Sequence, residues 1–155
     1  MIGRRYRHGY ACVNFGSPLS MRGYVREHGI DFRALGEDDR RAAVAEVGAL
    51  LMARIGAIVP VLPVPLVASV LLRDPARALG ELELKSEVQA LMARVEAAGG
   101  HVYVPRADRD YAVSVGLRML TLRGLVAERD GLFVADPDEL TLLRYYANSI
   151  EHVAA

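Results

Sequence analysis

The longest charge-free run of the sequence, IGAIVPVLPVPLVASVLL at residues 55–72, limits the possible folds more than any other feature. Its length approaches the roughly 20 apolar residues of a membrane-spanning helix. However, its prolines at positions 60, 63 and 65 remove backbone donors, and in lipid the carbonyl groups freed in this way would need other partners. We therefore expect a buried, kinked connection between two core helices rather than a membrane span.

The composition bounds the functional classes that are open to the chain. The 155 residues fit one domain, and 19 Lys and Arg balance 19 Asp and Glu, so no broad electric field attracts nucleic acid or an acidic membrane. The single cysteine, Cys12, cannot form an internal disulfide, which favours a reducing compartment. The first ten residues lack the apolar segment of a signal peptide. The chain alone is expected to be soluble and cytoplasmic.

Hydrophobic periodicity predicts a mostly helical α+β fold. Period-two alternation over residues 10–15 predicts one N-terminal strand, which Gly16 and Pro18 end. A short helix capped by Ser20 follows, and then a helical body. Its helices are predicted over residues 37–59, 65–73, 81–98 and 108–122. The segment LVAERDGLFVAD predicts a hairpin that turns at Asp130-Gly131, and a final helix begins after it.

The order helix, helix, hairpin in the second half is that of a winged helix. Winged helices bind DNA through a recognition helix in the major groove, and here that helix would be DYAVSVGLRMLTLRGL. It offers Arg118 and Arg123 but few other groups for phosphate contacts, which normally supply half to two-thirds of protein–DNA hydrogen bonds. The winged-helix-like half is therefore compatible with a nucleic-acid-binding module or with a protein-interaction module.

Known catalytic and metal-binding patterns are missing from the 155 residues. Cys12 stands apart from the four histidines, and no phosphate loop, dinucleotide-binding motif or nucleophile elbow occurs. His28 and Asp31 could form a general base with an orienting carboxylate. Because His28 precedes Gly29 at a predicted helix end, a surface or capping histidine is the favoured interpretation. We predict no catalytic, cofactor-binding or metal-binding residue.

Three separated segments resemble bacterial glycerol-3-phosphate 1-O-acyltransferases. The family's strand ending in Phe/Tyr-Gly-x-Pro-Ile/Leu-Ser-Leu-Arg is matched at Phe15, Gly16, Pro18, Leu19, Ser20, Met21 and Arg22. A second segment is similar at Arg54, Ile55, Pro60, Val61, Leu66, Val67, Ala68, Leu71 and Leu72. The family's Tyr-Tyr-x-Asn-x-Ile-x-His is matched at Tyr145, Tyr146, Asn148, Ile150 and His152. Ser17 and Gly56 depart from the family pattern.

The resemblance implies a parent enzyme that uses a His-x-x-x-x-Asp pair as its catalytic centre and a Pro-Glu-Gly-x-Arg-Ser segment for phosphate. Neither is present here, since Val13, Arg33 and Arg106 stand five residues after His8, His28 and His101. The chain therefore looks like the C-terminal region of such an enzyme and is expected to be inactive alone. Residues 1–35 would be the edge of the acyltransferase domain, and residues 36–155 a helical C-terminal domain.

The resemblance also implies partners and a location. The parent would transfer an acyl group from acyl-CoA or acyl carrier protein to the sn-1 hydroxyl of glycerol 3-phosphate, without a protein-bound cofactor. It would associate peripherally with the cytoplasmic side of the cell membrane, and no nucleic acid is expected. The partner of this chain would be the upstream catalytic domain.

Two features of the sequence indicate surfaces for that partner. The strand at residues 10–15 has no ladder partner nearby in the sequence, so its backbone groups need another sheet. The last helix places Leu143, Tyr146, Ile150 and Val153 on one face, and the opposite face is polar but nearly uncharged. Such a face suits a buried, hydrogen-bonded contact, and a helix that simply caps the local core is an equal alternative. The docking candidates are Phe15, Gly16, Pro18, Arg22, Arg54, Tyr145, Asn148 and His152.

Overall fold

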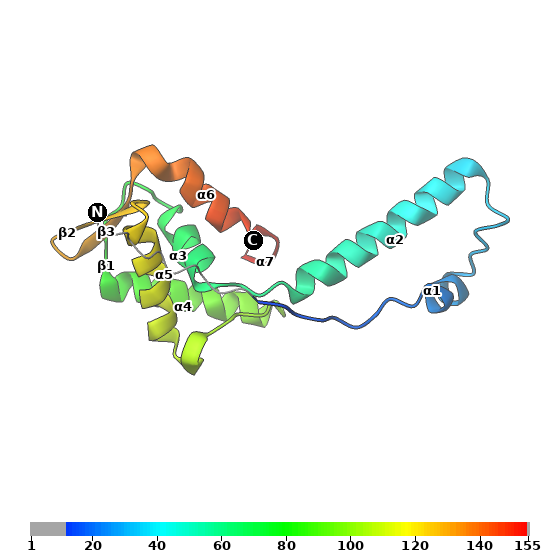
Figure 1. Cartoon of the computed structure of the whole chain (residues 1–155), viewed down its shortest axis with the longest axis horizontal. Coiled ribbons are helices and arrows are strands. Elements are labelled where there is room, and N and C mark those ends of the chain that lie inside the picture. The colour runs from blue at the N-terminus through cyan, green and yellow to red at the C-terminus, as the bar shows by residue number, and fades with distance from the viewer. Residues whose placement is uncertain (1–11, 155) are drawn as a thin grey trace, which may run out of the picture. The chain divides into compact units, whose positions relative to one another are not determined.

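The structure, a computed structural model, describes residues 12–154. Residues 14–59 form the N-terminal unit, and residues 60–154, with residues 12 and 13, form the C-terminal unit. Their helices and strands are labelled in Figure 1. The domain boundary predicted at residues 35–36 concerns the parent enzyme and stays a prediction.

The N-terminal unit begins with an irregular segment and not with the predicted strand. Residues 12–19 adopt no helix or strand, whereas residues 10 and 11 lie outside the described residues. The prediction of a strand at residues 12–15 is therefore wrong for this structure. A strand needs a paired neighbour for its backbone groups, and the hydrogen bond found here comes from a side chain: Asn14 Nδ2 donates to the Ile58 carbonyl at 2.8 Å.

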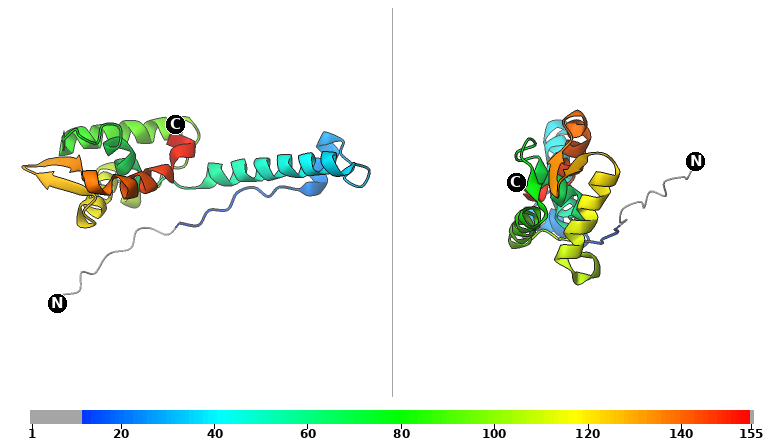
Figure 2. Two further views of the ribbon diagram at one scale, coloured as in Figure 1. Left: turned by 90° about the horizontal axis from the view of Figure 1, so that it is seen from above. Right: turned by 90° about the vertical axis from the view of Figure 1, so that its left-hand side faces the viewer.

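Two helices make up the rest of the N-terminal unit. Helix α1 (Met21–His28) starts as predicted, because the Ser20 hydroxyl accepts from the Gly23 amide at 3.1 Å. Helix α2 (Glu37–Ile58) carries three acidic residues in its first turn, where they suit the helix dipole. Figure 2 shows α2 as one long helix without a kink. It ends two residues before Pro60, as the proline predicts.

The C-terminal unit contains the remaining elements, in the order helix, strand, helix, helix, hairpin, helix, helix. They are α3 (Pro63–Leu71), β1 (Leu79–Gly80), α4 (Glu81–Ala97), the 3₁₀ turn η1 (Pro105–Ala107), α5 (Arg109–Leu122), β2 (Val126–Arg129), β3 (Leu132–Ala135), the 3₁₀ turn η2 (Pro137–Glu139), α6 (Leu140–Asn148) and α7 (Glu151–Ala154). This confirms a mostly helical α+β fold. The predicted final helix is divided into α6 and α7.

A small antiparallel sheet joins the helices of the C-terminal unit. Its strand order is β1-β3-β2, with Leu79 opposite Phe133 and Val126 opposite Ala135. The turn between β2 and β3 is formed by Asp130 and Gly131 as predicted, and both have a positive φ, 53° and 76°. The hairpin projects beyond the neighbouring helices (Figures 1 and 2). With α3, α4 and α5, this sheet has the element order of a winged helix.

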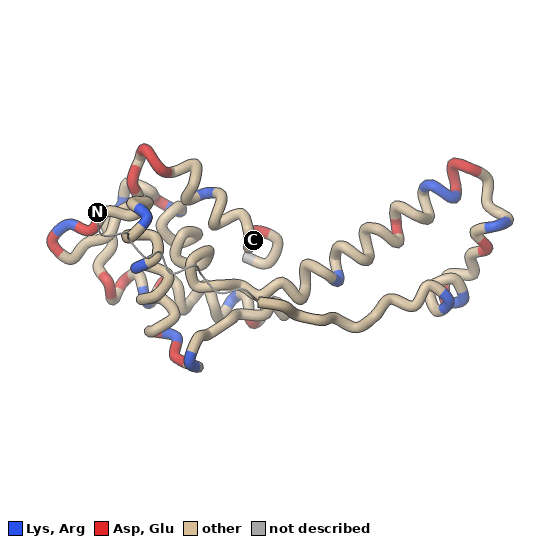
Figure 3. The backbone as a smooth tube through the Cα atoms, in the orientation of Figure 1, with Lys and Arg blue, Asp and Glu red and all other residues tan. Residues whose placement is uncertain are grey.

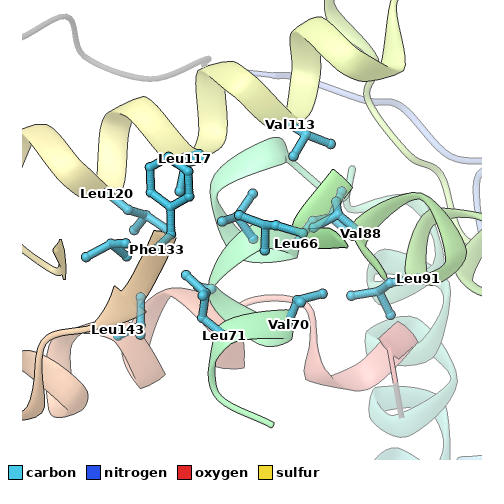
Figure 4. Packing of buried hydrophobic residues seen from close by; sticks show 14 of the residues in the cluster. Leu66, Val70, Leu71, Val88, Leu91, Val113, Leu117, Leu120, Phe133 and Leu143 are labelled. Carbon is cyan, nitrogen blue, oxygen red and sulfur yellow. The ribbon is translucent and has the colours of Figure 1, made fainter. Parts of the chain in front are cut away.

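The core of the C-terminal unit is built around α3. Seven of its nine residues are buried, so this helix is apolar on all sides and has neighbours on all sides. Figure 4 shows Leu66 and Leu71 of α3 among Leu117 of α5, Phe133 of β3 and Leu143 of α6. Residues 61–72 of the charge-free run therefore lie in the core or against it, whereas Ile55, Ala57 and Val59 are exposed at the end of α2, so the predicted buried connection is confirmed only in part. None of the helices of residues 12–154 is both long and apolar enough to cross a membrane.

Ion pairs fix the first turns of α4 on the outside of this core. Glu83 pairs with Arg77, and Glu87 lies 3.3 Å from both Arg73 and Arg77. Glu81 accepts a hydrogen bond from Lys85 Nζ at 2.8 Å, which raises the pKa of Lys85 above its ordinary value. These pairs are partly exposed, so each contributes little to stability by itself.

Candidate docking surfaces

The histidine that could have served as a general base has a structural role. His28 Nδ1 lies 2.9 Å from the Tyr24 carbonyl, and its ring stacks on the buried Tyr24 at 4.0 Å between centroids. Asp31 accepts instead from the Arg33 amide at 3.0 Å. His28 thus ends α1, as a capping histidine would. Among residues 12–154, no group of three or more His, Cys, Asp or Glu side chains could hold a metal ion.

The largest apolar surface of the N-terminal unit lies on α2. We call it the α2 apolar face; it consists of Val44, Leu51, Met52, Ile55 and Val59, with exposed fractions of 58%, 44%, 65%, 44% and 37%. Figure 3 shows why this helix is unusual: most of its charges lie in the first turns, and few follow. Ala43 is the only buried residue of α2. A helix with large apolar side chains on its solvent side marks an interaction surface.

The predicted docking residues at the start of the same unit have different surroundings. Phe15 is 93% exposed, and Pro18 and Arg22 are also exposed. Gly16 is exposed as well, but it lies close to α2, because a Cβ added there would lie 3.2 Å from Ile58 Cδ1. Arg54, on α2, is exposed. The unit thus presents Phe15 and the α2 apolar face to solvent, while Gly16 allows the irregular segment to approach the end of α2.

The predicted docking residues of the C-terminal unit lie at the end of the chain. Leu143 and Ile150 are buried as expected, whereas Tyr145 is 73% exposed and Asn148 and His152 are exposed. The Tyr145 ring meets the Tyr146 ring edge-on, with 6.0 Å between centroids. Asn148 ends α6 and His152 lies in α7, so a break in the helix separates them. The three candidates of this unit are therefore on the surface without a common regular helix.

Arginines of the winged-helix-like half mostly have protein partners. Arg109 pairs with Glu96 at 2.8 Å, Arg106 lies over the Tyr111 ring at 4.2 Å, and Arg123 donates to the Tyr146 hydroxyl. Arg118 is exposed on α5. This arrangement holds the N-terminal and C-terminal ends of α5 against their neighbours and leaves few cations for phosphate groups.

Sequence reasoning identified the α2 residues as a helical pattern but not as a docking surface. Val44, Val47, Leu51 and Ile55 are spaced for one face of a helix, which predicts that the face is covered. Only Val47 is half-buried, and the other three are exposed. The opposite side of α2 carries alanines at 45, 49, 53 and 57 and few charged residues. This scarcity of charge around the helix is the signal in the sequence that could have indicated a docking surface.

Comparisons with known proteins find similarity over almost the whole length of the chain. The model of the family "Glycerol-3-phosphate acyltransferase C-terminal region" matches residues 3–155. The chain is 26% identical to the glycerol-3-phosphate acyltransferase of Aeromonas hydrophila subsp. hydrophila, over 98% of this chain and 20% of the relative. For the enzyme of Actinobacillus pleuropneumoniae serotype 3 the values are 27%, 94% and 19%. No solved structure matches.

The chain spans about a fifth of the length of these curated relatives. The family model covers nearly all 155 residues, including both units and every predicted docking residue. The chain belongs to the glycerol-3-phosphate acyltransferase C-terminal region family.

Proposed function

We propose that this chain docks onto the acyltransferase domain of a glycerol-3-phosphate acyltransferase and braces it, without carrying out chemistry itself. The complete enzyme would transfer an acyl group from acyl-CoA or acyl carrier protein to the sn-1 hydroxyl of glycerol 3-phosphate, a step of phospholipid biosynthesis. It would act at the cytoplasmic side of the membrane through peripheral association. The family and the names of the relatives support this assignment.

The observation that carries the proposal is the lack of a core in the N-terminal unit. Only Tyr24 and Ala43 are buried in residues 14–59, although this unit contains a helix of 22 residues. Burying one large aliphatic side chain fully stabilises by about 1.5–3 kcal/mol relative to leaving it in water. Phe15 and the α2 apolar face therefore favour a partner that removes them from water.

The relatives indicate where that partner lies. About four-fifths of their length is outside the region that matches this chain. A contact between the two parts of one enzyme would cover the α2 apolar face, and the uncharged Tyr145 and Asn148 on α6 suit a second, more polar contact. Bracing means that the docked chain holds the acyltransferase domain in its active arrangement.

A reconstitution experiment tests this proposal. The part of the A. hydrophila enzyme that this chain does not match is produced with a tag, together with the 155-residue chain. We expect the chain to be retained by the tagged part, and we expect transfer of labelled acyl groups to glycerol 3-phosphate only when both are present. Replacing Val44, Leu51 and Ile55 together by Glu should weaken retention by about 100-fold or more, because several kcal/mol of apolar burial is lost.

Two controls make the result decisive. The first control is the segment of the A. hydrophila enzyme that corresponds to this chain. When this segment is supplied separately it must restore activity, because only then is the divided enzyme able to function. A matched variant with Leu82, Leu122 and Leu132 replaced by Glu carries the same charge at exposed sites of the C-terminal unit and should be retained. If the wild-type chain is not retained while the native segment is, or if the chain transfers acyl groups alone, the proposal is wrong.

The sheet order β1-β3-β2 supports the alternative of a winged-helix nucleic-acid-binding module. We nevertheless expect the chain not to bind DNA. When the chain is titrated at low salt into a labelled random duplex, the fluorescence anisotropy should not rise at the roughly micromolar concentrations where non-specific binders respond. The reasons are a net charge of +0 and the protein partners of Arg106, Arg109 and Arg123. Salt-sensitive binding at micromolar concentration that is lost on Arg118→Glu would instead favour the nucleic-acid function.

A further inference from the structure

We infer that the part of the acyltransferase that covers α2 is a single α-helix lying lengthwise along it, with a bulky side chain over Gly48. This inference rests on the proposed function and adds the form of the partner. The positions that would form the contact are Val44, Gly48, Leu51 and Ile55, which we call the α2 stripe. Met52 and Val59 border it.

The spacing of the α2 stripe is the first reason. Its members follow one another at intervals of four, three and four residues. This alternation of four- and three-residue steps is that of the a and d positions of a coiled coil, which keep one narrow line of side chains facing a neighbouring helix at a shallow crossing angle. Val44, Leu51 and Ile55 are all exposed, whereas Val47 and Ile58, which lie on the adjoining side, are half-buried. The α2 stripe thus lies on the uncovered side of α2.

Gly48 is the second reason. A glycine inside a helix costs about 1 kcal/mol relative to alanine, yet a Cβ added to Gly48 would meet no atom within 4 Å. Gly116 shows the contrast, since a Cβ there would lie 2.6 Å from the Pro63 carbonyl oxygen. Within residues 14–59, nothing explains the missing side chain at Gly48. A hole in the middle of an apolar stripe fits a knob from a facing helix.

The width and size of the α2 stripe decide between possible occupants. A sheet would cover a broader band that includes Ala45 and Ala49, which have no large side chains to reach it. A second copy of this chain is disfavoured by area, since stable interfaces use roughly 20–30 residues a side and the α2 stripe offers three large ones. Between two parts of one enzyme, a small helix–helix contact is enough for docking, because other contacts between the same two parts also contribute to the binding free energy.

A cysteine-protection scan on the reconstituted complex tests the inference. In a Cys12→Ser background, which has no other cysteine, single cysteines are placed at each position from 44 to 57 and labelled with a maleimide. Labelling depends on access to the thiol, and we expect docking to slow it by about tenfold or more at 44, 48, 51 and 55. Positions 46 and 53, on the opposite side of α2, should change little.

The size of residue 48 gives an independent readout. Gly48→Leu fills the hole while improving helix propensity, so the free chain should gain helicity and retention should weaken by about tenfold or more. Glu46→Leu is the matched control, because it adds the same side chain to the far side, and it should be retained normally.

The outcomes separate the inference from the proposed function. Normal retention with protection at all positions, or with Gly48→Leu retained like the wild type, would overturn the single helix and leave docking intact. Protection that rises with chain concentration in the absence of the tagged part would show that a second copy covers α2. Loss of retention of the wild-type chain would instead contradict the proposed function.

Discussion

Replacing Gly116 by alanine is expected to destabilise the C-terminal unit by about 2 kcal/mol, although alanine is the better helix former. The added Cβ would lie 2.6 Å from the carbonyl oxygen and 2.9 Å from the carbonyl carbon of Pro63. Both are backbone atoms of α3, so no side chain can rotate away and the helices α3 and α5 must move apart. Overpacking of this kind costs about 3 kcal/mol, and the gain in helix propensity returns roughly 1 kcal/mol of it.

Urea denaturation followed by circular dichroism, with amide hydrogen exchange of α3 and α5, measures this effect. Gly48→Ala is the control, because Gly48 is also inside a helix and has no atom near its added Cβ. It should leave exchange in α3 and α5 unchanged. Equal stability of the Gly116→Ala and wild-type chains would mean that the close approach of α3 and α5 does not determine the packing of this unit.

The parts of the fold that depend on local chemistry could be predicted from the sequence. Pro60 limits where α2 ends, because a proline interrupts a helix. A proline also suits the first turn of α3, although α3 begins at Pro63 and ends at Leu71, two residues before the predicted bounds of 65 and 73. Asp130-Gly131 predicts the hairpin through the positive φ that both positions require. Asp108 caps α5 by accepting from the Tyr111 amide at 2.9 Å, as its position in the sequence indicates.

The parts that depend on distant partners could not be predicted. The alternation at residues 10–15 satisfies the pattern of a strand, but a strand forms only where a neighbour completes its ladder, and residues 12–15 have none in this structure. β1 has two residues, Leu79 and Gly80, and exists because β3 lies beside it. The break between α6 and α7 has no proline or glycine to announce it.

The same distinction applies to the docking surfaces. The resemblance makes Phe15, Pro18 and Arg22 docking candidates; all three are exposed, and their docking role stays a prediction. Periodicity alone predicts that Leu51 and Ile55 are covered, and it cannot say by what. In the structure of residues 12–154 both side chains are 44% exposed, and this exposure defines the α2 apolar face.

Truncating Leu66 to alanine should destabilise the C-terminal unit most among single core substitutions, by about 3–5 kcal/mol. Leu66 is 0% exposed and belongs to α3, the helix that contacts α4, α5 and α6. Figure 4 shows its side chain between Val113 of α5 and Val70 of its own helix. Because several elements meet around it, the cavity cannot close by the movement of one neighbour. A small domain has about 5–15 kcal/mol of stability, so a loss of this size removes a large share.

The matched control is Leu122→Ala, the same change at a position of α5 that is 53% exposed. It should cost less than about 1 kcal/mol, because little burial is lost and no cavity forms. Urea midpoints of the two variants and the wild type give the comparison. Similar losses for Leu66→Ala and Leu122→Ala would show that α3 is not the centre of the core. A large loss at Leu66 alone, with α2 unaffected in hydrogen exchange, would show that the C-terminal unit derives its stability from its own core and that α2 does not depend on that core.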